Sequence, residues 1–356
     1  MTRGWIEIDL DAIVRNAMVI AARAPAILPM VKADAYGVGA LPVVRALERL
    51  SPWGYGVATI EEGRELRRAG ITRSIVLFTP VVAGDLRPVR DARITPALSS
   101  AESIAAWTTL GGGPWHLAID TGMSRAGARW DRVDALASML RACAPEGAFT
   151  HFHSASLDDG TMAEQEGRFE LALAALPARP AVLHAENSAA IARRSRSSWS
   201  LARPGIFLYG VGSGASAVVH PEPVVSLFAR VVELRGVRAG ESVSYDATYR
   251  AEDDRVIATL PIGYADGYRR ALGNRAYALV AGGRRAPVVG VVTMDMTMID
   301  VTGLQVAVGD VVTLLGNNGS ERLDIETLAA QAGASPYELL TALHSRLPRR
   351  YRGGEG

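Results

Sequence analysis

Between residues 25 and about 225 the chain alternates short β-branched runs with amphipathic segments, and this alternation limits the possible folds more than any other feature. Eight runs have the composition of strands: PAILPMVKA, WGYGVATI, RSIVLFTP, ARITPALSS, WHLAIDT, GAFTHFHSA, PAVLHAENS and LARPGIFLYG. Segments between them, such as LPVVRALERL, IEEGRELRRAGI and QEGRFELALAAL, have apolar residues three and four apart, which indicates helices. Eight strands with intervening helices predict a parallel (β/α)8 barrel of the TIM-like kind.

After residue 225 the pattern changes to alternating strands without long helices. The segments VSLFARVVELRGV, RVIATLPIGYA, YALVAGGRRAPVVGVV and MTMIDVTGL are bounded by Gly or Asp turns, and DIETLAAQAG indicates a short late helix. We therefore predict a fold of the α/β plus all-β class, with a barrel domain over 1–224 and a mainly β domain over 225–356. The length of 356 residues is typical of about two domains.

Composition excludes several classes of partner. The formal net charge is +1, which provides no field for capturing nucleic acid or an anionic membrane, so we expect small molecules or copies of the chain as partners. One cysteine excludes an internal disulfide framework, and six scattered histidines show no metal-ligand spacing, so no metal is expected. The start MTRGWIEIDLDA lacks an export signal and no apolar run reaches membrane-spanning length, which predicts a cytoplasmic protein.

Polar residues follow the predicted strands at the ends where barrels place their chemistry: Lys32, Arg125, His151, Asn187 and Arg203. A lysine at the end of a buried strand needs a partner or a chemical use. If it is desolvated, it can lose its proton, and the neutral amine can then attack an aldehyde such as that of pyridoxal phosphate. A lysine that extends its ammonium back to water is the ordinary alternative.

The last two predicted strands offer groups that suit the rest of this cofactor. Gly205 lets backbone approach closely, and the N–H groups of Gly205 and Ile206 can face a phosphate after the eighth strand. Ser188 can add its hydroxyl and N–H, although an ordinary turn and a helix N-cap explain these residues too. Arg203 can face the pyridine nitrogen, and because arginine is a very weak acid the ring would be a poorer electron sink than one facing a carboxylate.

Together, seven motifs resemble those of the alanine racemase family, whose members bind pyridoxal phosphate in a (β/α)8 barrel followed by a β domain. VKADAYG is similar to the cofactor-lysine motif, IDTGMSRAG to the fourth-strand motif and THFHSA to the histidine motif. LHAENS and ARPGIFLYG resemble the phosphate and arginine motifs, VSYDATY the tyrosine motif and VVTMDMTMIDV the second substrate motif. The resemblance runs in family order from WIEIDLDAIVRN to RLPRRY, essentially the whole chain.

The resemblance implies two catalytic bases. Lys32 would hold pyridoxal phosphate as a Schiff base and serve D-alanine, while Tyr245 would serve L-alanine from the other subunit of a homodimer with shared active sites. Racemisation needs a base on each face of a planar intermediate, and one lysine cannot reach both. The cofactor contacts implied are Lys32, Tyr36, Arg125, His151, Asn187, Ser188, Arg203, Gly205 and Ile206. The substrate contacts implied are Arg125, Tyr264, Met294 and Asp295.

The implied activity is interconversion of L-alanine and D-alanine, which supplies D-alanine for peptidoglycan. Two alternatives stay open: a related racemase with serine or broader specificity, and a pyridoxal-phosphate carrier without strong activity. Carriers of this kind end after the barrel, whereas this chain continues with VSYDATY and MDMTMID. A decarboxylase of the same fold would be expected to place a carboxylate at the pyridine nitrogen, where ARPG supplies Arg203.

The sequence departs from the family pattern at four positions. Ala118 stands where many members have a carbamylated lysine that orients the counterpart of Arg125. Ser345 stands where some members have a corridor tyrosine, Val38 replaces a histidine, and Thr293 replaces a cysteine. None of the four is a proposed base, so we predict that the reaction class is retained while rate and substrate range differ.

Overall fold

The computed structural model describes residues 3–343 and 345–354, which form two compact units. The first, here named the β unit, contains the described residues within 3–12, 36–39, 223–343 and 345–354. The second, the barrel unit, contains Ile13–Ala35 and Ala40–Glu222. Each unit has its own buried core of aliphatic and aromatic side chains.

The barrel unit is built on a parallel sheet in the order β2-β3-β4-β5-β7-β8. These strands are β2 (Gly54–Val57), β3 (Ser74–Leu77), β4 (Thr95–Leu98), β5 (His116–Asp120), β7 (Gly147–Phe149) and β8 (Val182–His184), and the short β6 (Ala128–Arg129) pairs with β5. Every residue of β2 and β4 is buried, as expected for strands covered on both faces.

Two further segments close this sheet into a ring. Residues 27–30 form parallel bridges from Met30 to Gly56 and from Ile27 to Ala202. Residues 201–203 continue the ring, since Leu201 N–H donates to Leu183 O at 3.2 Å. All eight predicted strands therefore contribute to the barrel, and the predicted (β/α)8 fold is confirmed.

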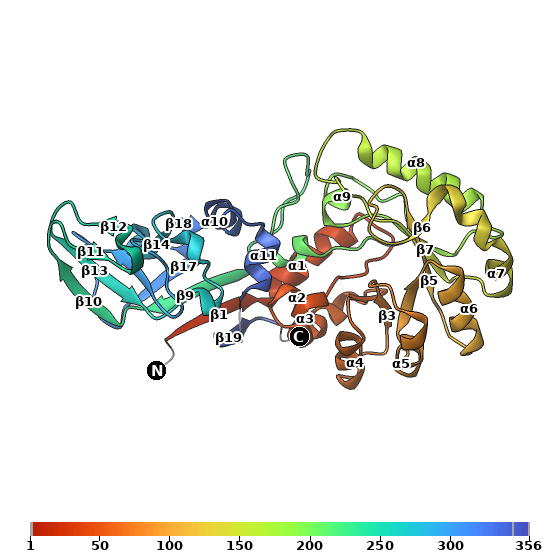
Figure 1. Cartoon of the computed structure of the whole chain (residues 1–356), viewed down its shortest axis with the longest axis horizontal. Coiled ribbons are helices and arrows are strands. Elements are labelled where there is room, and N and C mark those ends of the chain that lie inside the picture. Colours follow the sequence, from red (N-terminus) through yellow and green to blue (C-terminus); the bar gives the residue numbers. More distant parts are fainter. Residues whose placement is uncertain (1–2, 344, 355–356) are drawn as a thin grey trace. The chain divides into compact units, whose positions relative to one another are not determined.

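Helices lie outside these strands, as Figure 1 shows for α4 to α8. The structure contains α1 (Leu10–Ala21), α3 (Ala40–Leu47), α4 (Ile60–Arg68), α5 (Leu86–Asp91), α6 (Ala101–Thr109), α7 (Ala137–Ala142), α8 (Thr161–Ala174) and α9 (Ser188–Ala192). Predicted helices at LPVVRALERL, IEEGRELRRAGI and QEGRFELALAAL correspond to α3, α4 and α8. A reciprocal capping box between Thr59 and Glu62 fixes the start of α4.

The β unit contains a sheet in the order β15-β14-β17-β9-β1-β19, with β18 paired to β17, and two smaller sheets, β10-β13-β16 and β11-β12. The strand bounds are β1 (Gly4–Asp9), β9 (Val225–Arg230), β10 (Glu233–Val237), β11 (Ser242–Val243), β12 (Tyr249–Arg250), β13 (Arg255–Leu260), β14 (Tyr277–Val280), β15 (Arg284–Pro287), β16 (Thr297–Asp300), β17 (Val311–Asn318), β18 (Glu321–Leu323) and β19 (Arg349–Arg352). The predicted late helix is α10 (Ile325–Ala332), followed by α11 (Pro336–Thr341). The predicted mainly β character of this region is confirmed.

The first strand belongs to the β unit, although the predicted division at 224/225 placed it with the barrel. Strand β1 pairs antiparallel with β9 and parallel with β19, so its hydrogen bonds tie the start of the chain to segments more than 200 residues away. Because these pairings join distant segments, the two compact units are not separated by a single division of the chain.

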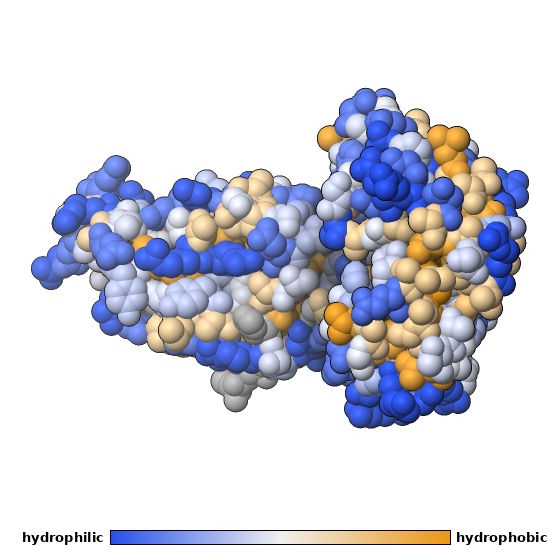
Figure 2. All heavy atoms as spheres, turned by 45° about the vertical axis from the view of Figure 1, so that its right-hand side comes forward, coloured by the Kyte–Doolittle hydropathy of each residue, from blue (hydrophilic) through white to orange (hydrophobic). Residues whose placement is uncertain are grey.

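The surface mixes polar and apolar side chains. In Figure 2 the forward face of the barrel unit carries apolar side chains near its centre and hydrophilic ones above and below them. Scattered apolar residues on a folded surface are ordinary, so no partner is assigned to this face. Within residues 3–343 and 345–354, no helix has the length and apolar character needed to cross a membrane.

Candidate active site

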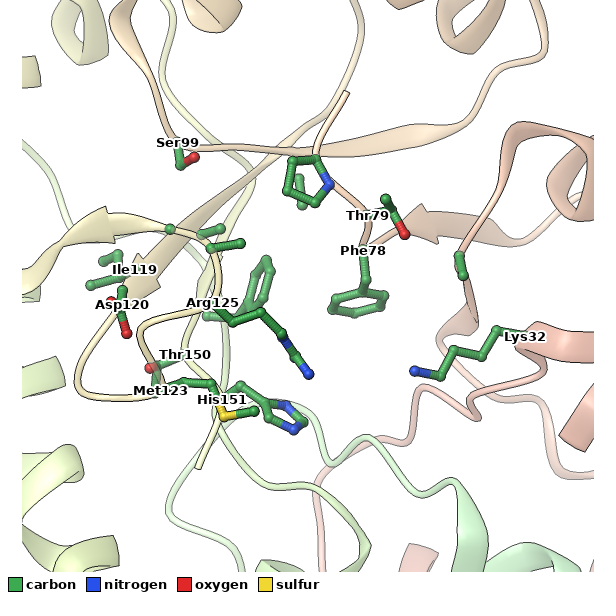
Figure 3. Close-up of a pocket in the computed structure, with 17 residues that line it drawn as sticks. Lys32, Phe78, Thr79, Ser99, Ile119, Asp120, Met123, Arg125, Thr150 and His151 are labelled. Carbon is green, nitrogen blue, oxygen red and sulfur yellow. The ribbon is translucent and has the colours of Figure 1, made fainter. Parts of the chain in front are cut away.

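A pocket of about 350 Å³ opens at the carboxyl ends of the barrel strands. Its lining includes Lys32, Arg125 and His151, three residues predicted for the site, together with residues that follow β2, β3, β4 and β7. In Figure 3 the Lys32 side chain points into the pocket toward Arg125 and His151, with Phe78 beside them. This end of the barrel is where such folds place their chemistry.

Lys32 begins an unusual left-handed turn, labelled α2 (Lys32–Tyr36). Four consecutive non-glycine residues, Ala33 to Tyr36, have φ between 52° and 56°. Left-handed backbone costs roughly 1–2 kcal/mol for each such residue. A turn of this cost persists only where the surroundings hold it, and it stands directly after the lysine.

Glu62 is the main clamp on the start of this turn. Its Oε1 accepts the Ala33 N–H at 2.7 Å, while its Oε2 accepts the N–H groups of Ala58 at 2.7 Å and Thr59 at 3.1 Å. One carboxylate therefore joins the residue after Lys32 to the end of β2 and to the cap of α4. At the other end of the turn, Asp34 Oδ1 accepts the Ala40 N–H at 2.7 Å.

Replacing Glu62 by alanine should destabilise the fold and loosen Lys32. The change removes the acceptor of three backbone N–H groups, and each such loss costs about 1–3 kcal/mol where water cannot replace it. We expect chemical denaturation to show at least about 1 kcal/mol of lost stability for Glu62→Ala. Glu61→Ala is the matched control, because Glu61 is exposed and its one ion pair among the described residues, with Arg64, is long at 4.0 Å. Equal stability of the two variants would contradict the clamp.

The electrostatics of the pocket favour a neutral amine. Burial lowers the pKa of the Lys32 ammonium, and the positive charges of Arg125 and Arg203 lower it further, against the opposing carboxylate of Glu62. Burial and the same cations lower the pKa of His151 to about 3, so its imidazole is neutral at physiological pH. A deprotonated amine on Lys32 is a nucleophile and a base.

Arg203 is buried beneath this pocket, with 3% of its surface exposed. Its Nη atoms donate to the carbonyls of Thr150 at 2.8 Å, His184 at 2.7 Å and Ala185 at 3.0 Å, and lie 3.4 Å from His151 Nδ1. Burial lowers the pKa of Arg203 to about 9, so the guanidinium stays charged at neutral pH. Among the described residues its Nε has no hydrogen-bond partner.

Three of the residues predicted to bind phosphate meet beside Arg203. Ser188 Oγ accepts the Gly205 N–H at 2.8 Å and the Phe207 N–H at 3.3 Å, and Ile206 begins the 3-10 helix Ile206–Tyr209. The side chain of Asn187 caps α9 by accepting the Ala190 N–H at 3.0 Å.

The remaining predicted cofactor contact, Tyr36, is buried in the β unit. Its ring lies 6.0 Å from that of Tyr337. Burial and the neighbouring Tyr337 phenol raise the pKa of Tyr36, which keeps its hydroxyl protonated.

The four other predicted residues line a hollow of about 960 Å³ in the β unit: Tyr245, Tyr264, Met294 and Asp295. Tyr245 is 68% exposed at the start of a short 3-10 helix, Tyr245–Ala247. The non-glycine residues beside it, Ser244, Asp246 and Ala247, all have positive φ. Strained backbone of this kind clusters at functional sites, which supports a role for the exposed phenol.

Asp295 and Tyr264 are fixed by their neighbours. Arg346 donates to Asp295 at 2.7 Å and lies 3.5 Å from the fully buried carboxylate of Asp266. Tyr264 N–H donates to Thr293 O at 3.0 Å. Gly263 allows this close approach, because a Cβ there would lie 2.3 Å from Thr293 O.

Comparison with known proteins identifies the family of this chain. A family described as the alanine racemase N-terminal domain matches residues 8–213, and one described as the alanine racemase C-terminal domain matches residues 224–351. The alanine racemase of Symbiobacterium thermophilum is 39% identical over 99% of this chain and 97% of its own length. The chain belongs to the alanine racemase family.

Solved structures of alanine racemases share the whole fold. That from E. faecalis has a TM-score of 0.92 at 30% identity and covers 99% of this chain and 98% of its own. Those from Bacillus anthracis, with bound L-Ala-P, and Bartonella henselae, with covalently bound pyridoxal phosphate, both have a TM-score of 0.91, at 31% and 29% identity. They cover 100% and 99% of this chain, and 96% and 100% of their own.

The donor set fits the cofactor of the alanine racemase family. The pocket supplies an amine of lowered pKa on Lys32 for an aldehyde, and Arg203 supplies a fixed charge with a spare N–H for a ring nitrogen. Ser188 supplies a hydroxyl and Ile206 a backbone N–H for a phosphate, and the Gly205 N–H, which donates to Ser188 Oγ, lies beside them. These residues would hold pyridoxal phosphate in the barrel unit.

Ala118, where many alanine racemases have a lysine, lines the pocket within an apolar cluster of Ala97, Phe149 and Phe78. In the described part of the chain, the guanidinium of Arg125 has no hydrogen-bond or ion-pair partner. Its loop is held instead by Asp120 Oδ1, which accepts the N–H groups of Gly122 and Ser124, both at 3.0 Å.

The other departures do not line the barrel pocket. Ser345 lies in an exposed turn, Val38 is fully buried, and the Thr293 hydroxyl donates to Met296 O at 3.0 Å.

Two features of the site were not predicted. Glu62 carries a readable signal, because Thr59 followed three residues later by Glu is a capping-box pattern, but that pattern does not reveal the bond to Ala33. The second feature is a chain of contacts from Arg203 through His184 to His116. Their positions at a strand end and a strand start give no local sign of that contact.

Proposed function

We propose that this chain interconverts L-alanine and D-alanine with pyridoxal phosphate as its cofactor. One observation supports this most strongly: in a member of the alanine racemase family, Lys32 points into the barrel pocket with a lowered pKa and Arg125 in the same lining. The reaction supplies D-alanine, which bacteria use in peptidoglycan. A racemase with serine or broader specificity is the second candidate, favoured by the small Ala118 in the pocket wall.

The chain's own residues then have distinct roles. Lys32 holds the cofactor and exchanges a proton on one face of the substrate, and Tyr245 exchanges a proton on the other. Arg125 presents an unpaired guanidinium that suits the substrate carboxylate, and Arg203 orients the ring through its spare Nε–H. When bound, the cofactor withdraws electrons from the α-carbon and acidifies its proton. Because Arg203 only donates, it leaves the ring nitrogen without an added proton.

A direct assay tests this function. Purified protein with added pyridoxal phosphate should abolish the optical rotation of L-alanine, and of L-serine more slowly, because one extra hydroxyl is rejected only weakly by a small pocket. Equal or faster loss with serine would favour the second candidate. An unchanged rotation of both amino acids, in protein shown to bind the cofactor, would contradict racemase activity.

We also propose that the active form is a cytoplasmic homodimer with shared sites. Tyr245, Tyr264, Met294 and Asp295 line an exposed hollow of the β unit, whereas Lys32 and Arg125 line the barrel pocket. In this proposal the β domain over 225–356 completes the site of the partner's barrel.

Mixing two inactive variants tests the shared site. Lys32→Ala and Tyr245→Phe should each be inactive toward L-alanine alone. After subunit exchange, each mixed dimer should regain one of its two sites. When half of the dimers are mixed, about a quarter of the wild-type activity should therefore return. Exchange is verified by mass spectrometry. Absence of recovery after verified exchange would indicate that each site is built within one chain.

A further inference from the structure

Four side chains form a row inside the barrel unit, from Arg203 at the pocket to Glu146 at the other end of the strands. Arg203 Nη1 lies 2.9 Å from His184 Nδ1, and His184 Nε2 lies 2.8 Å from His116 Nδ1. His116 Nε2 faces Glu146 Oε2 at 3.5 Å. Both histidines are completely buried, so water does not interrupt the row.

The chemistry of arginine fixes the direction of these hydrogen bonds. A guanidinium has only N–H donors, so His184 Nδ1 must accept and carries no proton. Burial lowers the pKa of both imidazoles, which keeps each neutral with one proton. That proton of His184 is on Nε2 and is donated to His116 Nδ1, so the proton of His116 is on Nε2 and points to Glu146.

The far end of the row is built to meet a carboxylate. Among the described residues, His116 Nε2 and Glu146 Oε2 are both buried atoms without another hydrogen-bond partner, and they face each other. A movement of a few tenths of an ångström completes the bond. Gly147 leaves space for the imidazole, because a Cβ there would lie 2.9 Å from His116 Nε2. The side chain of Glu146 is 35% exposed, so water reaches the outer part of this side chain.

Arg203 needs such support because its charge is buried without a direct ion pair. Within residues 3–343 and 345–354, no carboxylate lies within 4.0 Å of its nitrogens, and its acceptors are carbonyls and imidazoles. Glu186 opposes the loss of its charge from a greater distance, while Arg125 promotes it. A row of aligned hydrogen bonds that ends at a carboxylate polarises each acceptor and strengthens the bond to the guanidinium.

The row is also rigid. Phe149 stacks on His184 with ring centroids 5.0 Å apart, and Phe78 meets the same imidazole edge-on at 6.1 Å. The guanidinium of Arg203 lies 5.5 Å from the Phe149 ring and 5.8 Å from the Phe78 ring. These aromatic contacts limit rotation of His184 and of Arg203 together.

We propose that His184, His116 and Glu146 form a one-way hydrogen-bond chain that holds Arg203 charged and in place opposite the cofactor ring, which makes His116 and Glu146 positioning residues. The chain itself follows from the contacts of the described residues. Its effect on the ring rests on the proposed function. Two experiments therefore separate the two parts.

The first experiment is nitrogen NMR of the holoenzyme labelled with ¹⁵N-histidine, with His116→Gln and His184→Gln spectra to assign the signals. Both rings should be neutral with the proton on Nε2 across pH 6 to 8.5. Glu146→Gln should move the His116 Nε2 signal, because a neutral amide accepts less strongly than a carboxylate. Glu170→Gln, which changes an exposed carboxylate of α8, is the control and should move neither. A proton on His184 Nδ1, or an unmoved His116 signal in Glu146→Gln, would overturn the chain.

The second experiment measures the cofactor and the reaction in Glu146→Gln, the least buried change in the row. We expect a shifted absorption maximum of the bound cofactor and a kcat about 3- to 10-fold lower with KM little changed, since a charge-assisted bond is about twice as strong as a neutral one. Glu146→Asp should restore part of both. An unchanged spectrum and kcat would overturn the positioning role while leaving the racemase proposal intact. Inactive wild-type protein with the expected NMR signals would overturn the racemase proposal alone.

Discussion

Lys32→Ala should abolish both covalent cofactor binding and racemisation. The lysine is the proposed attachment point and one of the two bases, and no other lysine in the sequence can replace it. We expect wild-type protein to be yellow and to retain the cofactor after borohydride reduction, whereas the variant retains none. The loss of kcat should be at least about a thousandfold, as expected when a nucleophile and base are removed together.

The labelled position is unusually simple to establish. Lys32 is the only lysine in a chain whose other basic residues are arginine and histidine, so reduced cofactor can be fixed only there or at the amino terminus. Peptide mapping should find the label on the segment containing VKADAYG. Lys32→Arg is the control that keeps a long basic side chain but cannot form the linkage. A label at the amino terminus, or none, would remove the basis of the proposed function.

Tyr245→Phe should affect the two enantiomers unequally. The change removes the phenol proposed to exchange the α-proton of L-alanine, while the Lys32 face stays intact. In deuterated water we expect exchange from L-alanine to fall on the order of a hundredfold or more and exchange from D-alanine to fall far less. Proton NMR of each enantiomer measures the two rates separately.

A second tyrosine of the same unit provides the control. Tyr249 is partly buried in strand β12 and lies outside the hollow lining, so Tyr249→Phe should leave both exchange rates near wild type. Tyr264→Phe is a second control, because Tyr264 lines the same hollow but is not a proposed base. Equal losses for the two enantiomers in Tyr245→Phe would argue against one base for each face.

The barrel was predictable because its signals are local. Eight apolar runs of strand length, each bounded by a turn or an amphipathic segment, leave few other folds. Even the segments 27–30 and 201–203, which join the ring by single bridges, were recognisable from PAILPMVKA and LARPGIFLYG. The place of β1 was not, because its partners β9 and β19 are set by pairings across most of the chain.

Site residues were predictable where a motif places them at the end of a strand. Contacts that depend on the register between neighbouring strands were harder to predict. Lys32, Arg125 and His151 line one pocket of the barrel unit, and Tyr245 and Tyr264 line one hollow of the β unit. The contact of His116 with His184 arises from neighbouring strands β5, β7 and β8, whose register no single segment encodes.

The left-handed turn after Lys32 limits how this protein can be made more heat-resistant. Glycine at a position with positive φ normally relieves strain, and Ala33 is an exposed residue that such a strategy would choose first. The same change would free the backbone that fixes the lysine. The strained backbone at this turn therefore lowers the stability of the fold while it fixes the lysine. Searches for thermostable variants should retain the alanine there and look for stabilising changes elsewhere.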